Sequence, residues 1–243
     1  MIEDILNTYP RVRKPLTPAH EEIYVEEYKI NRGGEGILYR TTQKLESWMH
    51  HKIAHGQKTG NILELGAGSL NHVPYEDAAH DYDCIEPFSE LYENSRFLGR
   101  IRNIYNALEE VPSGAHYDRI ISVAVLEHMT DLPAMIAQSG LLLAPDGTFQ
   151  AGIPSEGGFL WGLAWRMTTG ISYRIRTGLD YGTVMRHEHV NTAGEIESIV
   201  GYFFRDLKLV RLPAPVLHFS LYTYIEAREP DITRCRAYLD QVS

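Results

Sequence analysis

Short apolar segments alternate with helical stretches in the middle of the chain, and this alternation constrains the fold more than any other feature. Strands that alternate with helices pair in parallel, through right-handed crossovers. Together with two later strand patterns, the segments predict an α/β fold with a doubly wound, mostly parallel, seven-stranded sheet. The five apolar segments of the alternating part are residues 61–65, 82–86, 102–105, 117–123 and 148–153.

The flanks of this pattern predict how the domain is extended. Residues 1–57 read as a polar N-terminal arm followed by an amphipathic helix, and residues 58–153 as the core of the sheet. Residues 154–191 interrupt the alternation with glycines, aromatic residues and arginines. We expect an insertion or lid there, after the fifth strand. Residues 192–243 are expected to complete the same domain with a helix and an antiparallel strand pair.

Local signals support these elements. Thr192 followed by Glu195 has the spacing of a capping box, which predicts a helix start. Residues 207–212 and 219–227 are rich in apolar and β-branched or aromatic side chains, and predict the two late strands. The Pro-Asp-Gly sequence at residues 145–147 predicts a turn that precedes the fifth strand.

Composition excludes several classes of protein. With 44% apolar and 23% charged residues the chain is of ordinary globular composition. Thirty-two acidic against twenty-three basic residues give a charge of −9, which disfavours nucleic acid as a partner. Cys84 and Cys235 alone cannot build a disulfide framework. Without an apolar run of the ~20 residues that a membrane span needs, and with an acidic start unlike a signal peptide, we expect a cytoplasmic protein.

A glycine-lined turn follows the first predicted strand. Gly66 and Gly68 remove side chains where the backbone would approach a ligand, and Glu86 ends the second strand, where a carboxylate can bind a ribose diol. Asn71 occupies the place of the third glycine in the dinucleotide fingerprint, so a pyrophosphate motif is incomplete. A cofactor with adenosine but no phosphate needs only the turn and the carboxylate. S-adenosylmethionine is such a molecule, and NAD remains the alternative.

Four motifs in this order resemble class I S-adenosylmethionine-dependent methyltransferases. They are ILELGAG at residues 62–68, Glu86, IISVAVLEH at residues 120–128, and LLLAPDG at residues 141–147 before an apolar strand. The resemblance covers residues 58–153 well and the rest in outline. It implies a Rossmann-like methyltransferase fold and S-adenosylmethionine as cofactor.

The resemblance also implies which residues contact the cofactor. Glu64 and the glycine turn would contact the methionine part, and Glu86 both ribose hydroxyls. Where the family often has an acidic residue beside adenine, this chain has Asn106, whose carbonyl oxygen can still accept from the amino group. Glu127 would lie at the mouth, facing the acceptor. The implied contacts are Glu64, Gly66, Ala67, Gly68, Glu86, Pro87, Asn106, Ala107, Leu108, Val123 and Glu127.

The predicted insertion carries a local excess of arginines within an acidic chain. Arginine forks bind phosphate and carboxylate groups, so these residues predict an anionic small-molecule acceptor, with arginines on a solvated face as the alternative. The gross pattern of residues 154–204 is loosely similar to bacterial methyltransferases that tailor surface glycans or other small molecules. The candidate acceptor-binding residues are Arg166, Arg174, Arg176, Arg186 and Tyr181.

Three histidines are candidate bases if the acceptor is a hydroxyl: His128, His187 and His189. Alternation in an extended segment would point His187 and His189 the same way. These two and Glu188 also resemble a metal pair, but the sequence shows no third ligand with defined spacing, so no metal site is predicted.

Three functions therefore remain open on the sequence. A small-molecule methyltransferase fits the motifs best. An NAD-dependent oxidoreductase is disfavoured by Asn71 and by the late strand pair. A non-catalytic subunit with a methyltransferase fold is disfavoured by the intact set of Glu64, the glycine turn and Glu86. The sequence gives no indication of the oligomeric state.

Overall fold

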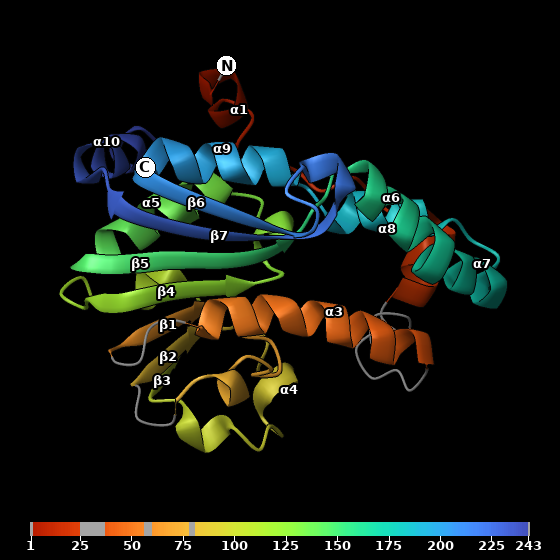
Figure 1. Cartoon of the computed structure of the whole chain (residues 1–243), viewed down its shortest axis with the longest axis horizontal. Coiled ribbons are helices and arrows are strands. Elements are labelled where there is room, and N and C mark those ends of the chain that lie inside the picture. The colour runs from red at the N-terminus through yellow and green to blue at the C-terminus, as the bar shows by residue number, and fades with distance from the viewer. Residues whose placement is uncertain (1, 25–36, 56–59, 78–80, 243) are drawn as a thin grey trace.

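The computed structural model describes residues 2–24, 37–55, 60–77 and 81–242, so part of the predicted N-terminal arm, residues 25–36, lies outside it. Seven strands form one mixed sheet, as predicted (Figure 1). The strands are β1 (Ile62–Leu65), β2 (Tyr82–Ile85), β3 (Asn103–Tyr105), β4 (Tyr117–Val123), β5 (Leu143–Pro154), β6 (Phe204–Pro213) and β7 (Ser220–Pro230).

The strand order places a switch point between β1 and β4. The order is β3-β2-β1-β4-β5-β7-β6, with β1 to β5 paired in parallel and β7 antiparallel to both β5 and β6. The chain first moves outward from β1 to β3 and then returns to β4 on the other side of β1. In such sheets ligands bind outside the carboxyl ends of the strands at the switch point. The ends of β1, β2 and β4 therefore define the place to look for a site.

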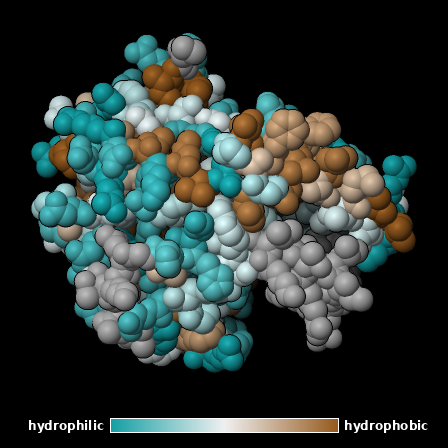
Figure 2. Space-filling model, viewed as in Figure 1, coloured by the Kyte–Doolittle hydropathy of each residue, from teal (hydrophilic) through white to brown (hydrophobic). Residues whose placement is uncertain are grey.

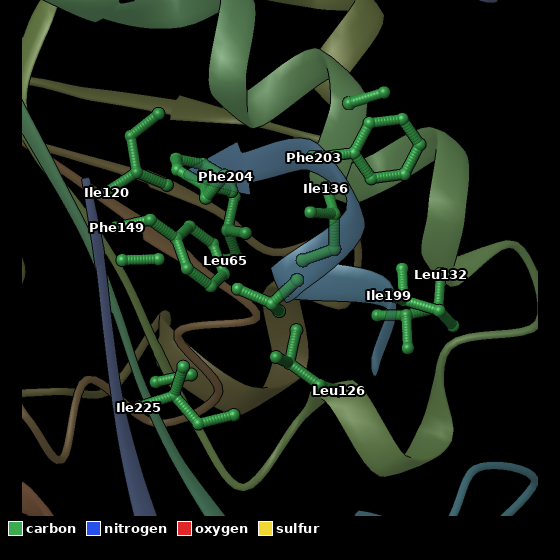
Figure 3. Packing of buried hydrophobic residues seen from close by; sticks show 14 of the residues in the cluster. Leu65, Ile120, Leu126, Leu132, Ile136, Phe149, Ile199, Phe203, Phe204 and Ile225 are labelled. Atoms are coloured by element: carbon green, nitrogen blue, oxygen red, sulfur yellow. The ribbon is translucent and has the colours of Figure 1, made fainter. Parts of the chain in front are cut away.

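Helices cover both faces of the sheet, which explains the nearly continuous apolar centre of β4. Ile120 belongs to the cluster beneath α5 (Leu132–Leu142), α9 (Ala193–Phe203) and α10 (Ile232–Val242), shown in Figure 3. Ile121 belongs to the cluster beneath α3 (Ile37–Ala54). Neighbouring residues of one strand thus serve opposite cores. The body also contains α1 (Ile2–Leu6) and α4 (Ser89–Tyr92).

Some boundaries differ from the sequence prediction. The Pro-Asp-Gly sequence does not precede the fifth strand, because β5 already begins at Leu143. Residues 144–147 form a bulge within β5. The pairing shows this bulge, since Tyr117 of β4 pairs with Leu143 and Arg119 pairs with Thr148. Proline has no N–H for the ladder, which favours a bulge there. Helix α10 was not predicted; Cys235 alone is buried on it. The capping box of Thr192 at the start of α9 is confirmed.

Residues 154–191 are mainly helical rather than an irregular loop. They form α6 (Phe159–Trp165), a π-helical turn (Arg166–Gly170), α7 (Ile171–Thr177) and α8 (Tyr181–Glu188), and α6 to α8 extend beyond the sheet in Figure 1. Figure 2 shows apolar surface over this segment. Its exposed large apolar side chains recur every four residues, at Phe159, Leu163, Met167, Ile171 and Ile175. Within the described part of the chain, no helix has the length and apolar character to cross a bilayer.

Candidate functional site

The glycine turn after β1 draws three strand ends together. Gly66 and Gly68 adopt positive φ angles of 68° and 52°, which glycine tolerates without strain. The amide groups of Gly66 and Ala67 both donate to the carbonyl oxygen of Ile85 at the end of β2, at 2.9 and 3.2 Å. A Cβ atom on Gly66 would lie only 2.7 Å from the methyl carbons of Val125, in the loop after β4. Glycine is therefore required at position 66.

Glu86 links the turn to the end of the second strand. Its side chain is buried, with Oε2 accepting from the amide of Gly68 at 2.8 Å and Oε1 from the amide of Phe88 at 3.0 Å. Each carboxylate oxygen keeps a second lone pair for a further donor. Pro87, between Glu86 and Phe88, is exposed. The arrangement fixes the orientation of a carboxylate at the switch point before any ligand arrives.

The loop after β3 lies beside Glu86, because the amide of Glu86 donates to the carbonyl oxygen of Tyr105 at 2.9 Å. Asn106 follows at the surface and donates from its backbone and side-chain nitrogens to Glu110, at 2.8 and 3.1 Å. Glu110 thus takes the donor group of the Asn106 amide, which leaves its carbonyl oxygen as the group suited to an adenine amino group. Ala107 is partly exposed and Leu108 is buried. The adenine contact remains a prediction.

Glu64 is held in the interior of the sheet. Its carboxyl is 2% exposed and accepts from the Tyr82 hydroxyl at 2.8 Å. Burial raises the pKa of Glu64 to about 7. Val123, at the end of β4, is partly exposed, and the next residue, Ala124, has a positive φ of 54°. Whether Glu64 and Val123 contact the cofactor also remains a prediction.

The loop after β4 carries a buried acid. Glu127 is 2% exposed, burial raises its pKa to about 7, and its Oε2 atom has no hydrogen-bond partner among the described residues. The carbonyl oxygen of Glu127 accepts from the amides of Val190 and Asn191, at 2.8 and 3.1 Å. The segment after α8 is thereby attached to the end of β4. Glu127 lies two residues beyond Val125, which packs on Gly66.

The structure separates the three candidate histidines. His128 and His189 meet with ring centroids 4.8 Å apart, and His189 Nδ1 lies 2.9 Å from a carboxylate oxygen of Glu156. Burial opposes the charged form of His189, but its hydrogen bond to Glu156 and the nearby acids outweigh burial and raise its pKa. His187 instead lies against the carbonyl oxygen of Lys14, at 2.6 Å. The predicted parallel orientation of His187 and His189 is wrong, because α8 continues to Glu188.

The predicted acceptor-binding arginines are only partly brought together. Three of them and Tyr181 line a cavity of about 270 Å³ beside α6, α7 and α8. Arg166 lies over the ring of Trp165 with 4.4 Å from its guanidinium carbon to the centroid. Arg176 does not line this cavity and donates to the Ser172 hydroxyl at 2.8 Å. The three arginines that share the cavity are Arg166, Arg174 and Arg186.

Sequence reasoning missed the contribution of the N-terminal residues. Arg13 donates to the carbonyl oxygens of His128 at 2.9 Å and Glu188 at 3.0 Å, so it joins the loops that carry His128 and His189. Tyr9 donates to the side chain of Asn191 at 2.6 Å. The sequence also contained no sign that Glu156 would contact His189. No local pattern marks these contacts, because each joins segments far apart in the sequence.

Comparison with known proteins gives matches only at the level of structure. No family model and no curated protein sequence matches the chain. A Thermotoga maritima protein described as an S-adenosylmethionine-dependent methyltransferase, possible histamine N-methyltransferase, superposes with a TM-score of 0.58 and 14% identity, over 87% of this chain and 98% of its own. A possible exported protein of Bordetella parapertussis also gives 0.58 at 14% identity, over 94% and 78% of the two chains.

A third solved structure carries ligands. The 1,6-didemethyltoxoflavin N1-methyltransferase of Burkholderia thailandensis, with bound substrate and S-adenosylhomocysteine, has a TM-score of 0.53 and 17% identity, over 90% of this chain and 94% of its own. These likenesses span nearly the whole domain. The chain has the fold of class I S-adenosylmethionine-dependent methyltransferases, which confirms the fold that the motifs predicted.

Proposed function

We propose that the protein is an S-adenosylmethionine-dependent methyltransferase. The observation that carries this proposal is Glu86, a buried carboxylate held by the amide of Gly68 at the switch point of a methyltransferase-like sheet. Such a group fits a ribose diol, and the adjoining turn lacks the third glycine of a pyrophosphate site. The Burkholderia neighbour, described with S-adenosylhomocysteine, supports the same cofactor.

The bound cofactor would supply a methyl group on a sulfonium for in-line transfer. The chain's part is to align the acceptor and to exclude water. Glu86 would hold the ribose, the backbone of Gly66 to Gly68 the methionine part, and Asn106 the adenine edge. His189 is the better placed of the candidate bases for a hydroxyl acceptor, because Glu156 orients its ring at 2.9 Å. His187, turned toward Lys14, is the least suited.

The acceptor is proposed to be a small anionic or glycan-related molecule. Arg166, Arg174 and Arg186 share one cavity with Tyr181, which offers guanidinium groups and an aromatic ring in one place. The helices that carry them connect directly to His189, through α8. A neighbour that methylates a small molecule, the Burkholderia enzyme, is consistent with this class of acceptor.

Calorimetric titration of the purified chain with S-adenosylmethionine, S-adenosylhomocysteine and NAD tests the cofactor. Glu86→Ala should weaken binding of the sulfur cofactors by about 2–3 kcal/mol, because charge-assisted bonds to two hydroxyls are lost. Glu90→Ala, which removes an exposed carboxyl of α4, is the matched control and should bind normally. Micromolar NAD binding with no heat from either sulfur cofactor would replace the proposal with an oxidoreductase.

Turnover is tested separately. Transfer of a labelled methyl group from S-adenosylmethionine to a panel of phosphorylated and carboxylated sugars should identify an acceptor. Uncharged sugars of the same size serve as the control panel. Cofactor binding without transfer to any charged or neutral acceptor would favour the non-catalytic subunit.

A further inference from the structure

Three potential metal ligands converge from two distant parts of the chain. Glu127 and His128 lie in the short 3₁₀ helix after β4 (Leu126–His128), and His189 directly follows α8. One ligand atom from each of the three residues can be chosen so that all lie within 4.8 Å of one another. Glu127 Oε1 and His128 Nε2 are 3.8 Å apart. The sequence offered His187 and Glu188 beside His189, whereas folding supplies Glu127 and His128 instead.

Each of the two imidazole rings is oriented by a hydrogen bond at its Nδ1 atom. His128 Nδ1 lies 2.9 Å from the carbonyl oxygen of Glu188, which can only accept, so Nδ1 carries the proton. His189 Nδ1 lies 2.9 Å from a carboxylate oxygen of Glu156. In the neutral rings the lone pair is thus on Nε2 in both cases. Metal-binding histidines have this arrangement, with one nitrogen on the metal and the other donating to a carbonyl or carboxylate.

The carboxyl of Glu127 is buried without a full set of hydrogen-bond partners among the described residues. Glu127 is only 2% exposed, and its Oε2 atom has no hydrogen-bond partner among the described residues. An unpaired buried carboxylate oxygen is unfavourable, and proteins usually satisfy such groups with a partner or a cation. Glu156 by contrast is satisfied, since Trp161 donates to the same oxygen that faces His189, at 2.6 Å. The Glu156 oxygen that orients His189 thus has its hydrogen-bond partners, whereas Glu127 Oε2 has none among the described residues.

From this geometry we propose that Glu127, His128 and His189 bind one divalent transition-metal ion, of the zinc, cobalt or manganese class. Two imidazole nitrogens and one carboxylate suit these ions better than magnesium or calcium, which prefer oxygen. Ligand atoms about 2.1 Å from a tetrahedral ion lie about 3.4 Å apart. The present ligand atoms lie within 4.8 Å of one another, so each pair needs to close by at most about 1.4 Å. Three protein ligands leave a coordination position open for solvent or an acceptor oxygen. Metal binding here does not depend on the proposed methyl transfer. With a metal ion on Nε2, His189 would be a ligand and no longer a base, because its lone pair is then shared with the ion.

The test is titration of chelator-treated apoprotein with Co²⁺, followed by its visible absorption and by calorimetry, in the absence of any methyl donor. The full chain should bind one ion with a ligand-field band of a site containing nitrogen and oxygen ligands. Glu127→Gln and His189→Gln keep the side-chain size and should abolish that band. Glu156→Gln keeps all three ligands and alters the hydrogen bonds that this side chain makes with His189 and Trp161, so it should lower affinity by about 10–100-fold.

His187→Gln is the matched control, because His187 lies two residues from His189 but faces Lys14. It should bind Co²⁺ as the original chain does. Circular dichroism of each variant establishes that it is folded, and the Glu156→Gln variant keeps all three ligands should either ligand variant unfold. Failure of the original chain to bind Co²⁺ or Zn²⁺ at millimolar concentration would overturn the proposal. So would binding that Glu127→Gln, His189→Gln and Glu156→Gln leave unchanged.

Discussion

The strand-end region around Glu86 and the helical segment of residues 154–191 are built in opposite ways. In the first, polar groups are buried and fixed by backbone partners, as where Gly68 and Phe88 both donate to Glu86. In the second, arginines and large apolar side chains are exposed, and Ile175 reaches 79%. Functional loops on a rigid scaffold commonly diverge in this manner. The proposed cofactor would therefore meet groups that are already fixed, and the proposed acceptor would meet exposed side chains.

The largest expected contrast comes from two arginines. Arg119 is 1% exposed and donates to both carboxylate oxygens of Glu76, at 2.7 and 2.9 Å. Arg119→Met should lower the free energy of unfolding by about 3–5 kcal/mol, because the buried carboxylate of Glu76 loses its guanidinium partner. Arg186→Met, which breaks an exposed pair with Asp180, should change it by less than about 1 kcal/mol. Urea denaturation measures both, and equal losses would contradict the comparison.

A pH series extends the contrast to a buried acid. The pKa of Glu64 is about 7 in the folded protein and ordinary when unfolded, so its carboxyl favours folding below pH ~4.5 and that contribution is lost as the pH rises through 7. Relative to Glu64→Gln, the original chain should therefore lose up to about 3 kcal/mol of unfolding free energy between pH 5 and 8. Glu90→Gln, at an exposed position, controls for general charge effects. A constant difference across this range would show that Glu64 stays ionised.

Alanine substitutions at two glycines with positive φ angles distinguish the cost of backbone strain from the cost of close packing. Gly66 has a φ of 68° and lies against Val125, whereas Gly178 has a φ of 75° with nothing within 4 Å of a Cβ atom. Alanine in the left-handed region costs about 1–2 kcal/mol at either position. Gly66→Ala should cost about 1–3 kcal/mol more, from overpacking. Thermal or urea unfolding of the two variants decides the matter, and an equal cost would mean that Val125 moves aside freely.

The smallest expected effect concerns the acceptor. Arg174 lines the cavity beside Tyr181, but Arg176 does not. Arg174→Ala should raise the acceptor KM by about 10-fold, the worth of one charge-assisted hydrogen bond at a partly open site. Arg176→Ala should change the acceptor KM by less than about 2-fold. Of the two arginines that the sequence predicted to bind the acceptor, only Arg174 would then do so. Steady-state transfer to an acceptor found in the sugar panel gives both values, with cofactor affinity unchanged. Equal effects would place the acceptor outside this cavity.

The sequence by itself determined the architecture and the geometry of the backbone at the strand ends. Short apolar segments located all seven strands. In β4 the segment is nearly continuous, because a parallel strand covered on both faces buries successive residues. Gly66, Gly68 and Glu86 were readable because a tight turn and a strand-end carboxylate each depend on neighbouring residues. The capping box of α9 was readable for the same reason.

Only the tertiary structure decided which side chains meet. Glu127 and His128 come after β4 and His189 after α8, and their approach depends on backbone bonds from Val190 and Asn191 to Glu127. A pattern of local spacing suggested His187 with His189, but the helical end of α8 turned them apart. Local sequence encodes the spacing of apolar residues along strands and helices, and the turns between them. The positions of side chains across a sheet edge depend on strand order and on how each connecting segment returns to it, which no short pattern contains.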